Sequence, residues 1–190
     1  MNQISEIIIK SIVVVFLTAM LFSCTNDSKE VRDFLAEKNL PIGKAKDAFH
    51  VYKDSGRITS KLITPLLLDF SNRKNHPYNE FPKGIKIINF DKNGVDSTTI
   101  TGDYALSYSK TSISELKGNV IVFNHTQESK LETTQLFWDQ KNKYFFSEKD
   151  FTFTNPTSSI SGIGFESKED LTKRVIRKVT GEIITNENEL

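Results

Sequence analysis

The sequence offers little from which cross-links or rigid turns could be built. Its 190 residues include one cysteine, Cys24, together with five prolines and one tryptophan. A single cysteine cannot form an intramolecular disulfide, so packing and hydrogen bonds must hold the fold together. Charge of one sign is also scarce, because 25 basic and 24 acidic residues leave a net charge of +1. That balance disfavours a nucleic-acid-binding surface.

Long apolar runs are scarce as well, and the longest lies near the N-terminus. Residues 12–22 form an apolar run after Lys10, shorter than the roughly 20 residues that a membrane-spanning helix needs. Such a length is typical of a signal-peptide core. The run ends in Leu21-Phe22-Ser23-Cys24, which resembles the lipobox of bacterial lipoproteins. We therefore predict a signal peptide over residues 1–23 and lipidation of Cys24. The alternative is an uncleaved membrane anchor.

The rest of the chain has the pattern of an all-β protein. Fourteen phenylalanines can build a core or line an apolar cavity. After residue 40, short β-favouring runs alternate with turn signals, and Asn93-Gly94 is a strong hairpin signal. This pattern argues against a parallel α/β sheet. The expected strands are residues 49–52, 58–63, 66–70, 84–90, 98–108, 119–123, 131–138, 144–146, 151–153, 160–165 and 175–184, with a loop over 72–82.

Motifs for catalysis or metal binding are missing from the sequence. His50, His76 and His125 stand alone, without the spacing of zinc ligands. Residues 91–96 faintly resemble a calcium loop, but Gly94 comes fourth rather than sixth, so a hairpin turn explains them better. No serine lies in a nucleophile elbow. We therefore predict no catalytic residue, no metal and no cofactor. An alternative hypothesis is an envelope hydrolase on a β-sandwich. It would require a cluster of carboxylates or histidines in one cleft, and the sequence gives no sign of such a cluster.

Several strings in one order resemble a known family. They are residues 81–85 (FPKGI), 116–122 (LKGNVIV), 131–133 (LET), 136–139 (LFWD) and 162–167 (GIGFES). Together with the lipobox they are similar to the LptC family of lipopolysaccharide-export proteins, in the lipoprotein form found in Bacteroidota. The resemblance divides the chain into a signal peptide (1–23), a lipidated tether (24–45), an LptC-like β domain (46–186) and a tail (187–190).

This resemblance implies a fold and a task. The fold is an OstA/LptA-like open β-jellyroll of two facing antiparallel sheets. The task is to receive lipopolysaccharide from an inner-membrane ABC transporter and pass it to an LptA-like periplasmic bridge protein. The protein would be periplasmic and anchored, on this view, in the inner membrane, and it would not be an enzyme. The competing hypothesis is a structural envelope lipoprotein with a closed β core and no lipid cargo.

An open jellyroll would hold acyl chains in an apolar groove between its sheets. Alternation along a strand places every second side chain there. The lining residues expected on this basis are Ile87, Tyr104, Val120, Val122, Leu136, Trp138, Phe151, Phe153, Ile163 and Phe165. A slip of one residue would place Ile121 and Phe123 inside instead. Each of these residues could equally pack a closed core.

The two ends of the jellyroll are expected to meet its partners. Unpaired edge strands can add a strand of another protein. The last strand is expected to join the bridge protein, through Arg174, Ile176, Lys178 and Ile183, and residues 49–63 are expected to face the transporter. Lys173, Arg174, Arg177 and Lys178 either contact lipid phosphates or form a solvated rim.

Overall fold

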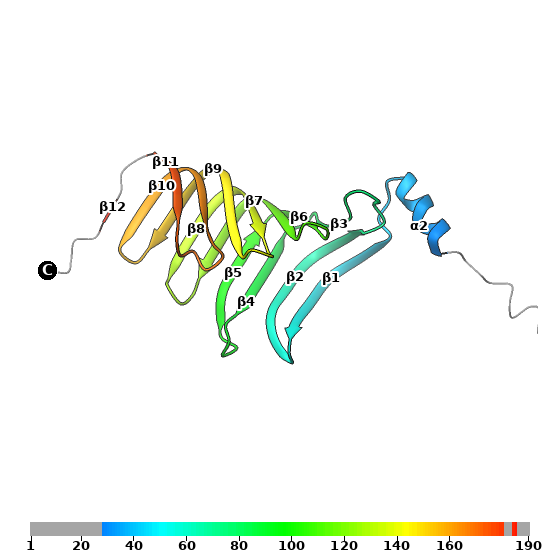
Figure 1. The fold of residues 1–190 in the computed structure, drawn as a ribbon, viewed down its shortest axis with the longest axis horizontal. Coiled ribbons are helices and arrows are strands. Elements are labelled where there is room, and N and C mark those ends of the chain that lie inside the picture. The colour runs from blue at the N-terminus through cyan, green and yellow to red at the C-terminus, as the bar shows by residue number, and fades with distance from the viewer. Residues whose placement is uncertain (1–27, 181–183, 186–190) are drawn as a thin grey trace, which may run out of the picture.

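Most of the described chain is β-strand, joined in one antiparallel sheet (Figure 1). The computed structural model describes residues 28–180 and 184–185. The sheet follows the helix α2 (Ser28–Glu37). Its strands are β1 (Gly43–Asp54), β2 (Arg57–Phe70), β3 (Tyr78–Phe81), β4 (Ile85–Phe90), β5 (Asp96–Gly102), β6 (Tyr104–Tyr108), β7 (Ile113–Asn124), β8 (Ser129–Asp139), β9 (Tyr144–Asn155), β10 (Ser158–Lys168), β11 (Val175–Val179) and β12 (Ile184–Thr185).

Tight turns with local hydrogen bonds connect neighbouring strands. Between β4 and β5, Asp91 Oδ1 accepts the backbone N–H groups of Asn93 at 2.8 Å and Val95 at 2.9 Å. These bonds, led by the one from Val95, lower the pKa of Asp91. Gly94 takes a φ of 80°, which glycine adopts without steric cost. The hairpin predicted from Asn93-Gly94 is thus confirmed.

A row of irregularities bends the sheet into two facing layers. The pairing register shifts between Lys117 and Val120 in β7, between Thr133 and Phe137 in β8, and between Ile163 and Phe165 in β10. Bulges of this kind bend a strand sharply. Towards the N-terminus the same bend falls in the breaks between β3 and β4 and between β5 and β6. We call this line of bends the corner.

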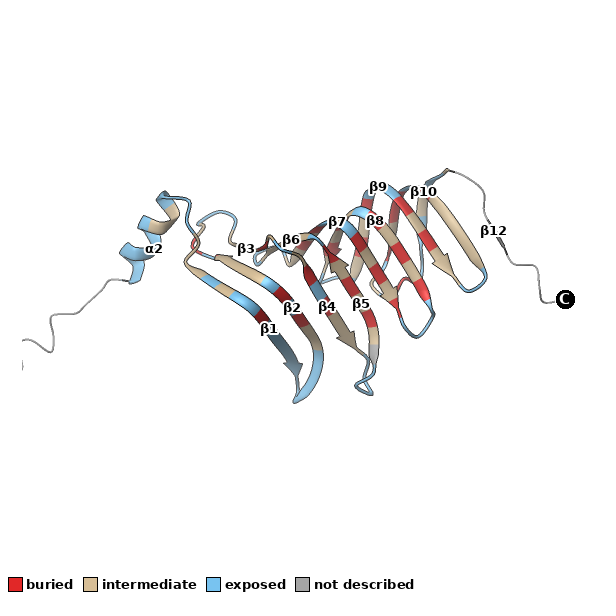
Figure 2. Cartoon of the chain, turned by 180° about the vertical axis from the view of Figure 1, so that it is seen from behind, coloured by how far each residue is buried: buried red, intermediate tan, exposed pale blue. Residues whose placement is uncertain are grey.

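The two layers share the long strands that cross the corner. Layer A contains β4 and β5, with the first part of β2 and the last part of β7. Layer B contains β3 and β6, with the last part of β2 and the first part of β7. β8, β9 and β10 also run from one layer into the other. Buried residues of both layers form one hydrophobic cluster, and Figure 2 shows them as stripes that alternate with less buried positions.

Buried hydroxyl groups satisfy the carbonyls that the corner releases from regular pairing. Thr64 Oγ1 donates to Gly84 O at 2.8 Å. Thr133 Oγ1 donates to Asp150 O at 2.8 Å, and Ser147 Oγ donates to the carbonyl of Gln135 at 2.7 Å. An unpaired buried carbonyl would be costly. The hydroxyls therefore stabilise the bend.

The sheet has one free edge at each end of the molecule. Among the described strands β1 pairs only with β2, and β11 pairs only with β10. Arg177 on β11 donates to Glu148 Oε1 and to Glu166 Oε1, both at 2.7 Å. The hydrogen bond from Arg177, followed by one from Tyr144, lowers the pKa of Glu166. These contacts fasten β11 to β9 and β10.

The structure confirms the predicted all-β jellyroll, with refinements. The two facing layers are halves of one continuous sheet rather than separate sheets. The segment 28–37 of the predicted tether is helical. β1 begins at Gly43, before residue 46, the predicted start of the β domain, and before residue 49, the predicted start of the first strand. β3 lies inside the predicted loop 72–82. The predicted signal peptide, Cys24 and the tail 187–190 lie outside the described residues. Within the described part of the chain, no helix is long and apolar enough to span a membrane.

The corner hydroxyls generate a stability prediction. Thr133→Val keeps the side-chain shape but leaves the Asp150 carbonyl without its donor. We expect the free energy of unfolding to fall by about 1 kcal/mol, measured by urea denaturation. Thr134→Val, at the exposed neighbouring position, is the matched control and should change stability little. Equal stabilities of the two variants would contradict the role of the hydroxyl.

Candidate functional site

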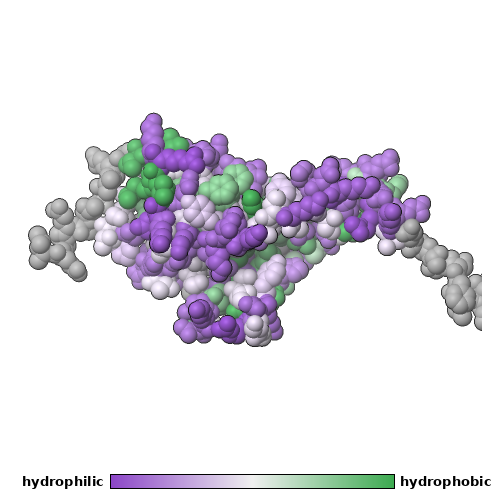
Figure 3. Space-filling model, in the orientation of Figure 1, coloured by the Kyte–Doolittle hydropathy of each residue, from purple (hydrophilic) through white to green (hydrophobic). Residues whose placement is uncertain are grey.

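A cavity of about 790 Å³ lies between the two layers in the N-terminal half of the sheet. Its size falls within the range of about 300–1,000 Å³ that is usual for ligand pockets. Strands β1 to β8 contribute residues to its wall, and it opens on the side opposite the corner. Figure 3 shows a hollow with hydrophobic side chains inside it, below the middle of an otherwise largely hydrophilic face. Its apolar lining includes Leu62, Phe81, Ile85, Ile87, Ala105, Leu116 and Trp138.

The deep part of the space between the layers is apolar in both layers. Cross-strand pairing aligns these side chains into one row per layer. In layer A the row is Leu62, Ile87, Ile100 and Val122. In layer B the row is Phe81, Ala105, Leu116 and Leu136. All eight are buried. Five of them, Leu62, Ile87, Phe81, Ala105 and Leu116, line the cavity, so its floor presents a hydrocarbon surface.

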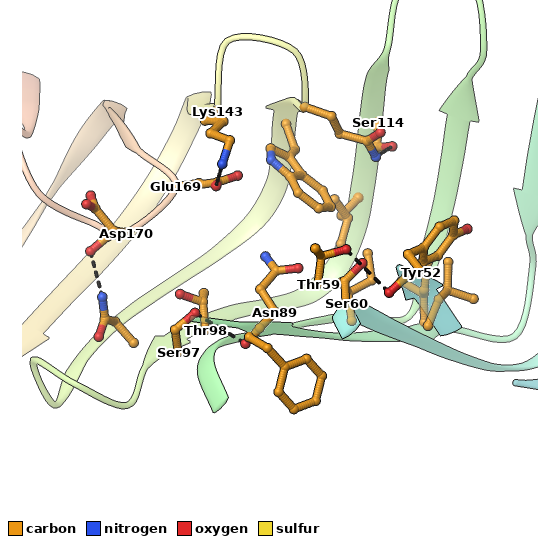
Figure 4. A pocket seen from close by; sticks show the side chains of 18 of the residues that line it. Tyr52, Thr59, Ser60, Asn89, Ser97, Thr98, Ser114, Lys143, Glu169 and Asp170 are labelled. Atoms are coloured by element: carbon orange, nitrogen blue, oxygen red, sulfur yellow. Dashed lines mark hydrogen bonds and ion pairs between the residues drawn. The ribbon is translucent and has the colours of Figure 1, made fainter. Parts of the chain in front are cut away.

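One step towards the opening, both layers turn polar. The next inward position on a strand is two residues away, about 7 Å. In layer A this mouth row is Ser60, Asn89, Thr98 and Asn124. In layer B it is Asn79, Ser107, Ser114 and Trp138. Figure 4 shows Ser60, Asn89 and Thr98 on one side of the pocket, with Ser114 and Lys143 on the other.

Hydrogen bonds organise the mouth row of layer B. Gln140 Nε2 donates to Ser114 Oγ at 3.0 Å, and Ser114 Oγ donates to Ser107 Oγ at 3.0 Å. The polar groups are therefore held along the wall by one another. The cavity thus has an apolar floor and a polar mouth, the arrangement that suits an amphiphile with its chains inward.

Charged side chains of both signs surround the opening. On one side, Arg57 is the first residue of β2, and Asp91 and Lys92 directly follow β4. On the opposite side Lys143 Nζ lies 3.5 Å from Glu169 Oε1, and Asp170 follows directly. The β2–β4 side therefore carries one excess positive charge, and the side near Lys143 carries one excess negative charge.

A loop of residues 169–174, which we call the strap, closes the same side of the jellyroll beyond the cavity. Asn124 Nδ2, in layer A, donates to Asp170 O at 2.8 Å. The Glu169 N–H donates to the carbonyl of Lys143, before β9, at 3.0 Å. The strap thus joins the two layers.

One strap side chain completes the core of the C-terminal half. Leu171 is fully buried, although its φ of 59° is in the left-handed region that non-glycine residues rarely adopt. Arg174 Nη1 donates to Leu171 O at 2.8 Å, and its guanidinium lies 4.2 Å from the ring centre of Phe153. The strap therefore ends the cavity, and the C-terminal half is closed.

The predicted groove residues fall into three groups: those that line the cavity, those that pack in the closed core, and two that do not face inward. Ile87 and Trp138 line the cavity. Six others face inward but are packed in the closed core: Val120, Val122, Leu136, Phe151, Phe153 and Phe165. The alternation along β7 places Val120 and Val122 inside and the alternative pair, Ile121 and Phe123, on the other face.

Tyr104 and Ile163 do not lie on the inner face, which corrects their predicted position. After Gly102 the corner inserts Asp103, so Ala105 rather than Tyr104 turns inward. The Tyr104 hydroxyl donates to Glu80 Oε1 at 2.9 Å; burial and this hydrogen bond raise its pKa. In β10 the bulge at Gly164 likewise leaves Ile163 exposed beside the inward Phe165.

Sequence reasoning missed Leu62, Phe81, Ile85, Ala105 and Leu116 among the cavity residues. The alternation that selected Ile87 also selects Ile85, two residues earlier, so that signal was present in the sequence. The other four depend on which strands flank the opening, which is a property of the tertiary fold.

The predicted partner strand forms in part. Ile176 on β11 packs against the core, and Lys178 pairs with Ile163. Arg174 and Arg177 contact Phe153 and two glutamates, respectively. Ile183 lies outside the described residues.

Groups that could bind metal are not found in the described part of the chain. No cluster of three His, Cys, Asp or Glu side chains occurs there. His50, His76 and His125 are exposed and lie on separate segments.

Comparison with models of known protein families gives a match. A family model described as "Lipopolysaccharide-assembly, LptC-related" matches residues 12–183, which is most of the 190-residue chain. A search of curated proteins finds no match. The family match confirms the resemblance to the LptC family and assigns a role in lipopolysaccharide transport in the cell envelope. The chain belongs to the LptC-related family of lipopolysaccharide-assembly proteins.

Proposed function

We propose that this protein binds the acyl chains of lipopolysaccharide in the cavity between layers A and B during export. It would receive the lipid from the inner-membrane ABC transporter and pass it to an LptA-like bridge protein in the periplasm. One observation carries the proposal: both layers are apolar near the corner and polar at the mouth. An amphiphile has the same order of polarity along its length.

The energetic reason is the cost of exposing acyl chains to water. Each methylene group that leaves water contributes about 0.8 kcal/mol. Leu62, Ile87 and Leu116 supply apolar surface for such groups. Ser60 and Asn89 in the mouth row of layer A line the opening and would contact polar parts of the lipid. The proposed mechanism is therefore binding and release, with energy supplied by the transporter.

The free edges support the proposed handover between proteins. Val175, Val179 and Ile163 are exposed along β11 and β10, and Figure 3 shows a hydrophobic patch over this end. A strand with one unpaired edge, beside exposed apolar side chains, suits β-strand addition. We assign this edge to the bridge protein and the β1 edge, with exposed Phe49, to the transporter.

The proposed anchor is a lipidated Cys24 in the inner membrane. Its support is the lipobox-like sequence before it. The amide-linked and ester-linked chains of a lipoprotein give firm attachment, whereas one acyl chain alone gives marginal binding. Such an anchor would keep the jellyroll beside the transporter.

A structural role without cargo is the second candidate function. The C-terminal half favours it, because Phe145, Phe153 and Phe165 are fully buried and the strap seals the core. The two functions differ in what they predict for the inner face of the N-terminal half.

Photo-crosslinking in cells tests the cavity. A photoreactive amino acid at Ser60 or Ile87, on the inner face, should give covalent adducts with lipopolysaccharide, detected by immunoblotting. The neighbours Lys61 and Ile88 point to the other face by alternation and serve as matched controls. Absence of adducts at all four positions would support the structural role instead, and adducts at the controls alone would exclude this cavity as the binding site.

Charge at the β11 edge tests the handover. Val175→Lys combined with Val179→Lys should reduce co-purification with the bridge protein at least several-fold, because edge lysines oppose strand addition. Val95→Lys, at an exposed position in the β4–β5 turn, is the control. Thermal unfolding and adduct formation at Ser60 should be unchanged in both variants. Normal co-purification of the double variant would exclude this edge.

A further inference from the structure

Trp138 occupies the boundary between the apolar floor and the polar mouth. It is the fourth member of the mouth row in layer B, paired directly with Ser114 on β7. Leu136, two residues before Trp138 on β8, is buried and belongs to the apolar row. Gln140, two residues after Trp138 and nearer the opening, is exposed. The indole therefore lies at the depth where the wall changes character.

The indole N–H is a buried donor without a protein acceptor. Trp138 is 7% exposed and lines the cavity. Its Nε1 has no hydrogen-bond partner among the described residues. Buried polar groups are nearly always paired, and tryptophan N–H groups usually find a partner when buried. The indole ring lines the cavity, and its Nε1 atom is itself covered, so the N–H keeps an unused hydrogen bond directly beside the space that a ligand would enter.

The charges around Trp138 favour a neutral acceptor for its N–H group. Near Trp138 the mouth carries Lys143, which is already paired with Glu169, and the additional carboxylate of Asp170. This excess negative charge opposes a phosphate group. The tryptophan N–H is itself neutral and offers a single hydrogen bond. A carbonyl oxygen satisfies it without bringing a charge into the wall.

Carbonyl groups also lie at the matching depth in an acylated lipid. The ester and amide carbonyls join each hydrocarbon chain to the headgroup. When the chain contacts Leu116 and its neighbours in the apolar row, the carbonyl reaches the level of the mouth row. The headgroup then extends towards Arg57 and Lys92 on the opposite side of the opening.

We propose that the Trp138 N–H donates a hydrogen bond to the ester or amide carbonyl of a bound acyl chain. This inference rests on the proposed function, since it assigns the part of the lipid that the cavity recognises. Trp138 acts as a specificity residue that distinguishes acyl from alkyl chains and fixes how deeply the chain enters.

Two lipids that differ only in the carbonyl test this assignment. The full-length protein, solubilised in dodecyl maltoside, which has no carbonyl, is titrated with ester-linked dilauroyl phosphatidylglycerol or with ether-linked didodecyl phosphatidylglycerol. Calorimetry should show about 3- to 10-fold tighter binding of the ester lipid to the wild type, the range expected for one neutral hydrogen bond. In Trp138→Phe this preference should disappear, because the ester lipid loses about this factor in affinity relative to the ether lipid.

A second measurement needs no variant. Trp138 is the only tryptophan in the sequence, so ¹⁵N-labelled protein gives one indole N–H resonance. The ester lipid should shift this resonance downfield, and the ether lipid should not. This readout separates a hydrogen bond from a packing effect of the indole ring.

The outcomes separate the inference from the proposed function. Equal binding of the two lipids to the wild type, or equal weakening of both in Trp138→Phe, would overturn the role of the N–H and leave lipid carriage standing. An unmoved indole resonance at saturating ester lipid would do the same. Absence of binding by either lipid, together with absence of adducts at Ser60, would overturn both.

Discussion

The corner is the constraint on which the rest of this structure depends. Each long strand must bend there, so that its two halves face each other across one interior. The register shifts in β7, β8 and β10 provide the bend, and Thr64, Thr133 and Ser147 satisfy carbonyls along it. A flat sheet of the same strands would expose its apolar inner face to water. The bend therefore creates both the core and the cavity.

The halves of the molecule differ in how far that interior is closed. Towards the C-terminus, aromatic side chains and Leu171 of the strap fill the space between the layers. Towards the N-terminus the layers stay apart and leave an opening lined by polar rows. The closed half supplies stability, and the open half supplies a surface on which a lipid can lie. One fold thus combines a rigid scaffold with a binding site.

The polar rows explain how an open cavity remains compatible with a stable sheet. The inward positions near the opening carry serine, threonine and asparagine in place of the aliphatic residues found near the corner. Ser107, Ser114 and Gln140 bond to one another, which holds the wall in place. Trp138 combines both characters in one side chain, with an apolar ring and one polar atom.

The sequence alone determined the all-β class, the family and several turns. Alternating apolar residues and signals such as Asn93-Gly94 act locally, so they can be identified without coordinates. The same alternation placed Val120, Val122 and Trp138 on the inner face. It could not say which inward residues line a cavity and which fill a core, because that depends on the distance between layers. Tyr104 and Ile163 were misplaced because a corner or bulge residue reverses the alternation, and such a reversal becomes visible only when strands pair.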